Sequence, residues 1–155
     1  MATYTKQMQQ IVEDYRAAGE PWPAAAKTTA AWAIRKGLWQ LHRAAAIKKC
    51  DEDLASAMRE EYYTDKKGRR VRLLHPATVR RNGEQLVLWD DHRTAPREHM
   101  QLSFQQRRKA IVGDCRQLKV DCDSYNDAHA EATPIVMEFD FTMDLAEIEA
   151  AEEAA

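Results

Sequence analysis

The residues best suited to chemistry with anions lie in one short segment, from Lys66 to Arg81. Its sequence, KKGRRVRLLHPATVRR, contains seven Lys or Arg residues and no Asp or Glu. Five of the seven are Arg, whose planar guanidinium group matches the geometry of a phosphate. Binding of these cations to a nucleic-acid backbone would release counterions and weaken as salt rises. The segment therefore predicts a phosphate-binding surface formed by Lys66, Lys67, Arg69, Arg70, Arg72, Arg80 and Arg81.

Two further charged groups bear on this surface. Arg107 and Arg108 stand near the start of a predicted helix, where the helix dipole favours acids, so we expect these cations to extend the binding surface. Residues 138–155 hold seven acids and no base, which explains a formal net charge of only -2. This acidic tail can compete with phosphate for the basic segment. The alternative is that both blocks are simply solvated.

A cluster of acids and histidines suggests a second kind of site, one that binds a metal ion. Its members are Asp90, Asp91, His92, Glu98 and His99. Such side chains beside a basic patch can hold a divalent metal for phosphodiester cleavage, which makes a metal-dependent nuclease an alternative function. No known ligand spacing supports it, and no nucleotide-binding, zinc-protease or serine-hydrolase motif is present. We therefore assign no catalytic residue, metal ligand or cofactor and expect no enzyme activity.

Composition places the chain among globular proteins. It has 155 residues, of which 45% are hydrophobic and 31% charged. No run approaches the roughly 20 apolar residues of a membrane span, and no export signal is recognisable, so we expect a cytoplasmic protein without membrane contact. The cysteines at 50, 115 and 122 form no CxxC pair and are expected to be reduced and mostly buried.

Three helices are predicted in the first part of the chain, over about 3–18, 28–37 and 43–62. Apolar residues recur at spacings of three and four, Gly19 and Gly37 follow the first two helices, and Thr28/Thr29 is the expected cap of the second. The pattern then becomes alternating, which predicts an antiparallel hairpin over 69–90. Asn82-Gly83 is a strong signal for its turn and places Arg80 and Arg81 at the tip.

A long amphipathic helix is predicted over 99–130. Ser103 and Gln106 have the spacing of a capping box and would begin its regular part. Apolar residues then follow at spacings of seven, four, three, four and three: Phe104, Ile111, Cys115, Leu118, Cys122 and Tyr125. This heptad pattern is typical of a helix that packs within its own domain or forms a homodimer through residues 104–125. Residues 131–155 read as a strand, IVMEFDFTM, followed by the acidic tail.

The order of helices and an Arg-rich hairpin over residues 28–90 resembles a winged-helix domain. The resemblance implies that Arg70, Arg72, Arg80 and Arg81 form the wing and that the helix before it enters the DNA major groove. That helix carries five acids against four bases, and base readout would fall to few residues, such as Lys48, Lys49, Ser56 or Arg59. The predicted fold is α+β, mainly α, with a winged-helix-like domain over 1–98.

The predicted function is DNA binding, regulatory or architectural, with RNA as an alternative ligand. Parts of the long helix and of the segment after it, RRKAIVGDCRQLKVDCDSYND and EFDFTMDLAE, are also similar to uncharacterised bacterial proteins. This similarity implies a bacterial or phage-type protein and no particular activity. The other function left open is a protein-interaction or assembly module that uses the heptad helix.

Overall fold

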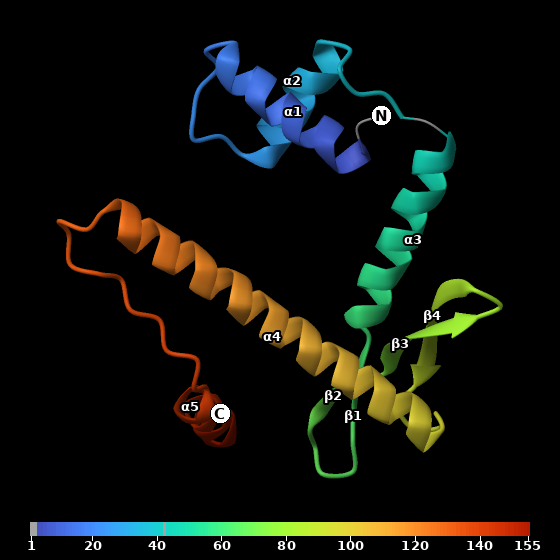
Figure 1. Cartoon of the computed structure of the whole chain (residues 1–155). Helices are drawn as coiled ribbons and strands as arrows, with labels where there is room; N and C mark the ends of the chain where they lie inside the picture. Colours follow the sequence, from blue (N-terminus) through green and yellow to red (C-terminus); the bar gives the residue numbers. More distant parts are fainter. Residues whose placement is uncertain (1–2, 42) are drawn as a thin grey trace. The chain divides into compact units, whose positions relative to one another are not determined.

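The computed structural model describes residues 3–41 and 43–155. The chain divides into two compact units, Met1–Ala57 and Met58–Ala155. Five helices and four strands are assigned in the described residues (Figure 1). The predicted fold class, α+β and mainly α with a long helix in the C-terminal part, is confirmed. No helix in the described ranges has the length and apolarity needed to cross a membrane.

The first unit is organised around two helices, α1 (Tyr4–Ala17) and α2 (Ala26–Arg35). Thr3 caps α1 by accepting a hydrogen bond from the Lys6 amide at 3.2 Å. Tyr15 and Trp32 meet edge to face with ring centroids 5.4 Å apart, and Ile11 and Ala33 complete this buried core. Helix α2 begins at Ala26, before the predicted Thr28/Thr29 cap. Thr29 lies inside the helix, where its side chain is buried.

Helix α3 (Arg43–Arg59) is shorter than predicted, since Tyr62 already belongs to a strand. None of its described side chains is buried, and Ile47 and Leu54 are 73% and 57% exposed. Its apolar stripe is therefore not covered by the rest of the first unit. The thiol of Cys50, expected to be buried, is exposed on the same helix.

The basic segment is divided between two hairpins, not contained in the single hairpin over 69–90 that the sequence predicted. Strand β1 (Tyr62–Thr64) pairs with β2 (Arg70–Arg72), and β3 (Leu74–Arg81) pairs with β4 (Glu84–Asp91), both antiparallel. Leu73 joins them: its amide donates to Glu61 O and its carbonyl accepts from the His92 amide, at 2.9 and 2.8 Å. Arg70 and Arg72 thus belong to a different ladder from Arg80 and Arg81.

The turn of the second hairpin is the one predicted. Asn82 and Gly83 have φ values of 52° and 78°, as a type I′ turn requires at both central positions. Arg80 lies opposite Gln85, and Arg81 opposite Glu84, so the two cations do stand at the hairpin tip.

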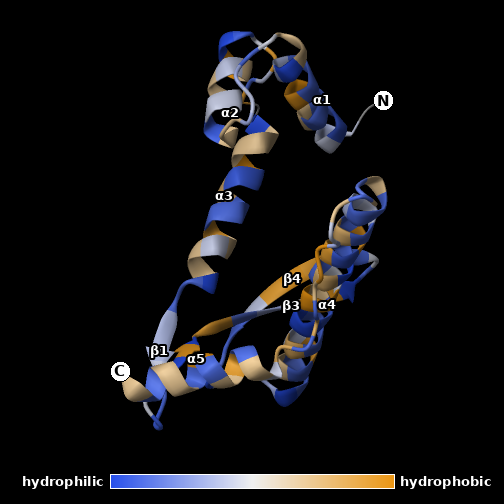
Figure 2. Cartoon of the chain, turned by 90° about the vertical axis from the view of Figure 1, so that its left-hand side faces the viewer, coloured by the Kyte–Doolittle hydropathy of each residue, from blue (hydrophilic) through white to orange (hydrophobic). Residues whose placement is uncertain are grey.

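Helix α4 (Arg97–Ala128) begins six residues before the predicted capping box. The capping-box prediction is wrong, because Ser103 and Gln106 lie inside the helix and bind strand β3 instead. Figure 2 shows both hydrophilic and hydrophobic residues along α4.

The strand predicted after α4 is absent. Residues 134–141 are an irregular, stretched segment (Figure 1), held to α4 where the Asn126 side chain accepts from the Ile135 amide and donates to its carbonyl, at 2.9 and 2.8 Å. The acidic tail then forms helix α5 (Thr142–Ala154), in which no residue is buried.

Candidate nucleic-acid interface

Three arginines from three elements of the second unit line one surface groove of about 280 Å³. Arg59 lies at the end of α3, Arg72 on β2 and Arg107 on α4. The other lining residues are apolar or neutral polar, apart from one histidine: Leu74, His75, Pro76, Thr78, Val87, Ser103 and Gln106. No carboxylate is among them, so the groove concentrates positive charge without a local counterion.

The electrostatics of the groove agree with this arrangement. Partial burial lowers the pKa of Arg107, and the positive charge of Arg72 lowers it further. The Arg59 guanidinium group lies over the Trp89 ring, 5.4 Å from its centroid, in a cation–π contact. Guanidinium groups that repel one another and lack acids are stabilised by an anion, and a phosphate offers several oxygens to them at once.

The groove is held open by contacts between α4 and the outer edge of β3. His99 Nε2 donates to His75 O at 2.8 Å, and Ser103 Oγ donates to Pro76 O at 2.6 Å. Gln106 binds both backbone groups of Thr78, accepting from its amide at 2.7 Å and donating to its carbonyl at 2.8 Å. The three side chains are spaced by four and three residues and so share one face of the helix. They satisfy an edge that would otherwise be open to pairing with another strand.

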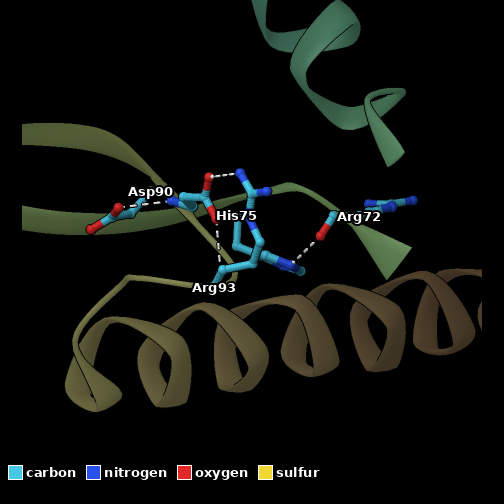
Figure 3. Close-up of polar contacts among 5 residues, drawn as sticks. Arg72, His75, Asp90 and Arg93 are labelled. Atoms are coloured by element: carbon cyan, nitrogen blue, oxygen red, sulfur yellow. Dashed lines mark hydrogen bonds and ion pairs between the residues drawn. The ribbon is translucent and has the colours of Figure 1, made fainter. Parts of the chain in front are cut away.

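His75 connects this edge to the backbone of Arg72 (Figure 3). It is 4% exposed, and its Nε2 lies 3.0 Å from Arg72 O and 2.9 Å from His92 Nδ1. A carbonyl only accepts hydrogen bonds, so Nε2 carries the proton and His92 Nδ1 is also an acceptor. The neutral His75 ring therefore fixes the strand that carries Arg72.

We expect the second unit to lose stability as the pH falls below about 6.5, the ordinary histidine value. Burial lowers the pKa of His75, the hydrogen bond to Arg72 O partly opposes this, and the charges of His92, Arg107 and Arg72 lower the pKa further. The unfolded chain therefore binds a proton at His75 more tightly than the folded chain does. The contribution of neutral His75 to the free energy of unfolding is complete above about pH 6.5 and is lost below it. The free energy of unfolding in urea, measured at pH 7.5 and 5.5, should differ less between the two pH values in His75→Asn than in the wild type. Equal pH dependence in the two proteins would contradict this role.

The predicted cations of the first hairpin lie at its turn or along β2. Lys66, Lys67 and Arg69 are at the turn, where the Asp65 carboxylate accepts from the Arg69 side chain and amide and from the Lys67 amide. These hydrogen bonds, led by that from the Arg69 side chain, lower the pKa of Asp65. Arg69 is thus already paired with an acid just outside the basic segment. Arg70 stacks over the Tyr62 ring at 4.1 Å.

The remaining predicted cations are exposed and separate from the groove. Arg80 and Arg81 stand at the β3–β4 turn, and Arg108 is on α4 beside Arg107. The structure therefore brings Arg72 and Arg107 together and leaves the two hairpin tips as distinct basic points. The sequence suggested Arg59 only as a possible base-reading residue of the helix before the hairpin, and did not group it with the basic segment.

Four of the five residues considered for metal binding have other hydrogen-bond partners: Asp90, Asp91, His92 and His99. Asp91 binds the Arg93 side chain and amide at 2.8–3.0 Å, and these bonds lower its pKa to about 2 (Figure 3). Asp90 accepts from the Asp91 amide at 2.7 Å. Among the described residues, no group of three or more His, Cys, Asp or Glu side chains could share a metal ion.

Comparison of the chain with protein-family models, with curated proteins and with solved structures finds no match. The arginine groove is therefore interpreted from its own chemistry.

Proposed function

We propose that the protein binds nucleic acid, with DNA as the favoured ligand, by holding backbone phosphates in the groove lined by Arg59, Arg72 and Arg107. The observation that carries the proposal is a groove lined by three arginines and by no carboxylate. Arginine suits this task because its donors bind phosphate oxygens in pairs.

The cations at the two hairpin tips would extend the contact along the backbone. Lys66 and Lys67 would do so on one side, and Arg80 and Arg81 on the other, as winged-helix-like wings do. Contacts of this kind position a protein on a duplex and carry no sequence information. The proposed role is accordingly regulatory or architectural, with weak sequence preference, and RNA is the alternative ligand because its backbone offers the same phosphates.

Competition by the acidic tail stays a prediction. In the fully described second unit, the ion pairs join near neighbours in sequence: Asp65 with Arg69, Asp91 with Arg93, and Lys119 with Asp123. None joins residues 138–155 to the basic hairpins. The groove arginines thus have no acidic partner from the tail in this arrangement, which leaves them free for an external anion.

The proposal is tested by titrating the full chain against a random duplex of about 20 base pairs at 50 and 200 mM salt, followed by fluorescence anisotropy. If the groove neutralises three phosphates, the log–log salt slope is about -2.7, and affinity falls roughly 40-fold between the two salts. Single-stranded RNA in the same assay separates the two ligands. Absence of binding to both nucleic acids at 50 mM salt would overturn the proposal.

A further inference from the structure

The second unit has almost no hydrophobic core of its own. Across residues 58–155, all of which are described, Ala77 is the one buried hydrophobic residue, and the buried polar residues are His75 and Ser103. In the 32 residues of α4 only Ser103 is buried. A unit of this size ordinarily buries well over half of its surface to offset the entropy of folding. Its missing core must be supplied by another surface.

Helix α4 presents a suitable surface. Phe104, Ile111, Leu118 and Tyr125 recur every seven residues and are 47%, 52%, 46% and 52% exposed. Cys115 and Cys122 lie between them and are half-buried. At about 100° per residue, this seam lies roughly 110° around the helix from the face that binds β3. The two ends of the seam already have neighbours within the unit: Phe104 meets the His75 ring edge to face at 5.5 Å, and the Cys122 thiol donates to Ile135 O at 3.2 Å. The middle of the seam, from Ile111 to Leu118, is free while α4 remains bound to the hairpin.

We propose that this seam binds the same seam of a second copy of the chain, as a parallel, in-register two-stranded coiled coil. The spacing of seven, four, three, four and three places Leu118 and its equivalents at heptad position d, and Cys115 and Cys122 at position a. Asp114 then occupies g, and Lys119, five residues later, occupies the e position that faces it across a parallel dimer. In the antiparallel arrangement Asp114 would face Asp121 of the second copy, a like-charge contact. The charges therefore favour the parallel pair.

The area available fits a dimer. An aromatic side chain can bury about 150–250 Å² of surface. Each seam residue is about half exposed, so each has on the order of 100 Å² of surface that a second chain could cover. Next to the seam, the segment held by Asn126 adds exposed apolar side chains: Ile135, Val136, Met137, Phe139 and Phe141. Together they approach the roughly 800 Å² that each partner contributes to a standard interface. Arg108 occupies an a position near the start of the seam, where a polar residue fixes register at some cost in stability.

Sedimentation equilibrium of the full chain at 5–100 μM, taken as roughly the range over which such dimers form, tests the proposal. The wild type should be a dimer, and Leu118→Asp should be a monomer with the helical circular dichroism of α4 largely retained. Val120→Asp is the matched control, because Val120 is also exposed, at 38%, and lies roughly 200° around the helix from Leu118. A monomeric wild type, or equal behaviour of the two variants, would overturn the proposal.

Crosslinking tests whether the seams of two copies face each other at Cys115. In the protein with Cys50→Ser and Cys122→Ser, Cys115 is the one remaining thiol. A short bis-maleimide should then join two chains through Cys115 when Leu118 is kept and should fail when Leu118→Asp is added. A dimer by sedimentation that gives no Cys115 crosslink would overturn the parallel, in-register arrangement.

Discussion

Replacing Arg72 and Arg107 together by Gln should lower the affinity for duplex DNA at 50 mM salt by about ten- to a hundred-fold. Each replacement removes one charge-assisted phosphate contact, worth roughly 1 kcal/mol or more. The salt slope should also become shallower by about 2, because two fewer counterions are released. Anisotropy titrations at four salt concentrations measure both quantities. Gln is a neutral polar side chain that suits a partly exposed site on a strand or a helix, so the folded unit should be retained.

The matched control is Lys109→Gln combined with Arg116→Gln, which also removes two positive charges from the same unit. Both residues are exposed on α4 and lie outside the groove lining, and both occupy heptad position b, away from the proposed seam. Their loss should change affinity less than two-fold, on the order expected for remote exposed charges. An equal loss of affinity in the control and in the Arg72/Arg107 variant would mean that net charge, not the groove, determines binding.

Sequence patterns predicted the local features of the basic region and not its pairing. The Asn82-Gly83 turn was predictable because positive φ at two successive residues is demanded by one turn type and tolerated by few residues. The pairing of Tyr62–Thr64 with Arg70–Arg72 was not, because β1 has three residues and no alternation long enough to recognise. The single predicted hairpin consequently merged two ladders that meet at Leu73.

Ser103 and Gln106 show how one sequence motif can serve two structures. Their spacing suits a capping box, but the same spacing places both side chains on one face of a helix already under way. Which outcome occurs depends on whether a strand edge lies alongside, and that is a tertiary fact. The strand predicted over IVMEFDFTM, residues 135–143, is absent for the complementary reason. A strand needs a pairing partner, and here the Asn126 side chain binds only the backbone of Ile135.

The sequence likewise indicated the positive charge of the candidate site, but it did not indicate which arginines line one groove. The abundance of Arg in residues 66–81 indicated phosphate chemistry directly. The groove, however, joins Arg59, Arg72 and Arg107, which are separated by 13 and 35 positions in the chain. Their meeting depends on the docking of α4 on β3, which rests on a few buried polar contacts that carry no hydrophobic signature.

That docking should be sensitive to a single side chain. We expect Gln106→Ala to destabilise the β3 edge by roughly 2–4 kcal/mol, because the Thr78 amide and carbonyl both lose their partner in a partly buried place, at about 1–3 kcal/mol for each unsatisfied group. Hydrogen exchange of the Ala77, Thr78 and Val79 amides measures this directly, since local opening should make them exchange about 30- to 1000-fold faster. Affinity for DNA should fall as well, because the opening moves Arg107 on α4 away from Arg72 and so takes apart the groove that both residues line.

Gln105→Ala supplies the control for this change, since Gln105 is the exposed neighbour on the same helix. The two variants have identical composition and nearly identical helix propensity, so any difference between them reports the contact with β3. In Gln105→Ala, the free energy of opening obtained from exchange of the β3 amides should stay within about 0.5 kcal/mol of the wild-type value, as is usual for surface changes. If Gln106→Ala exchanges no faster than Gln105→Ala, the carboxamide contact does not hold the strand. The groove would then have to be formed by the Ser103 and His99 contacts alone.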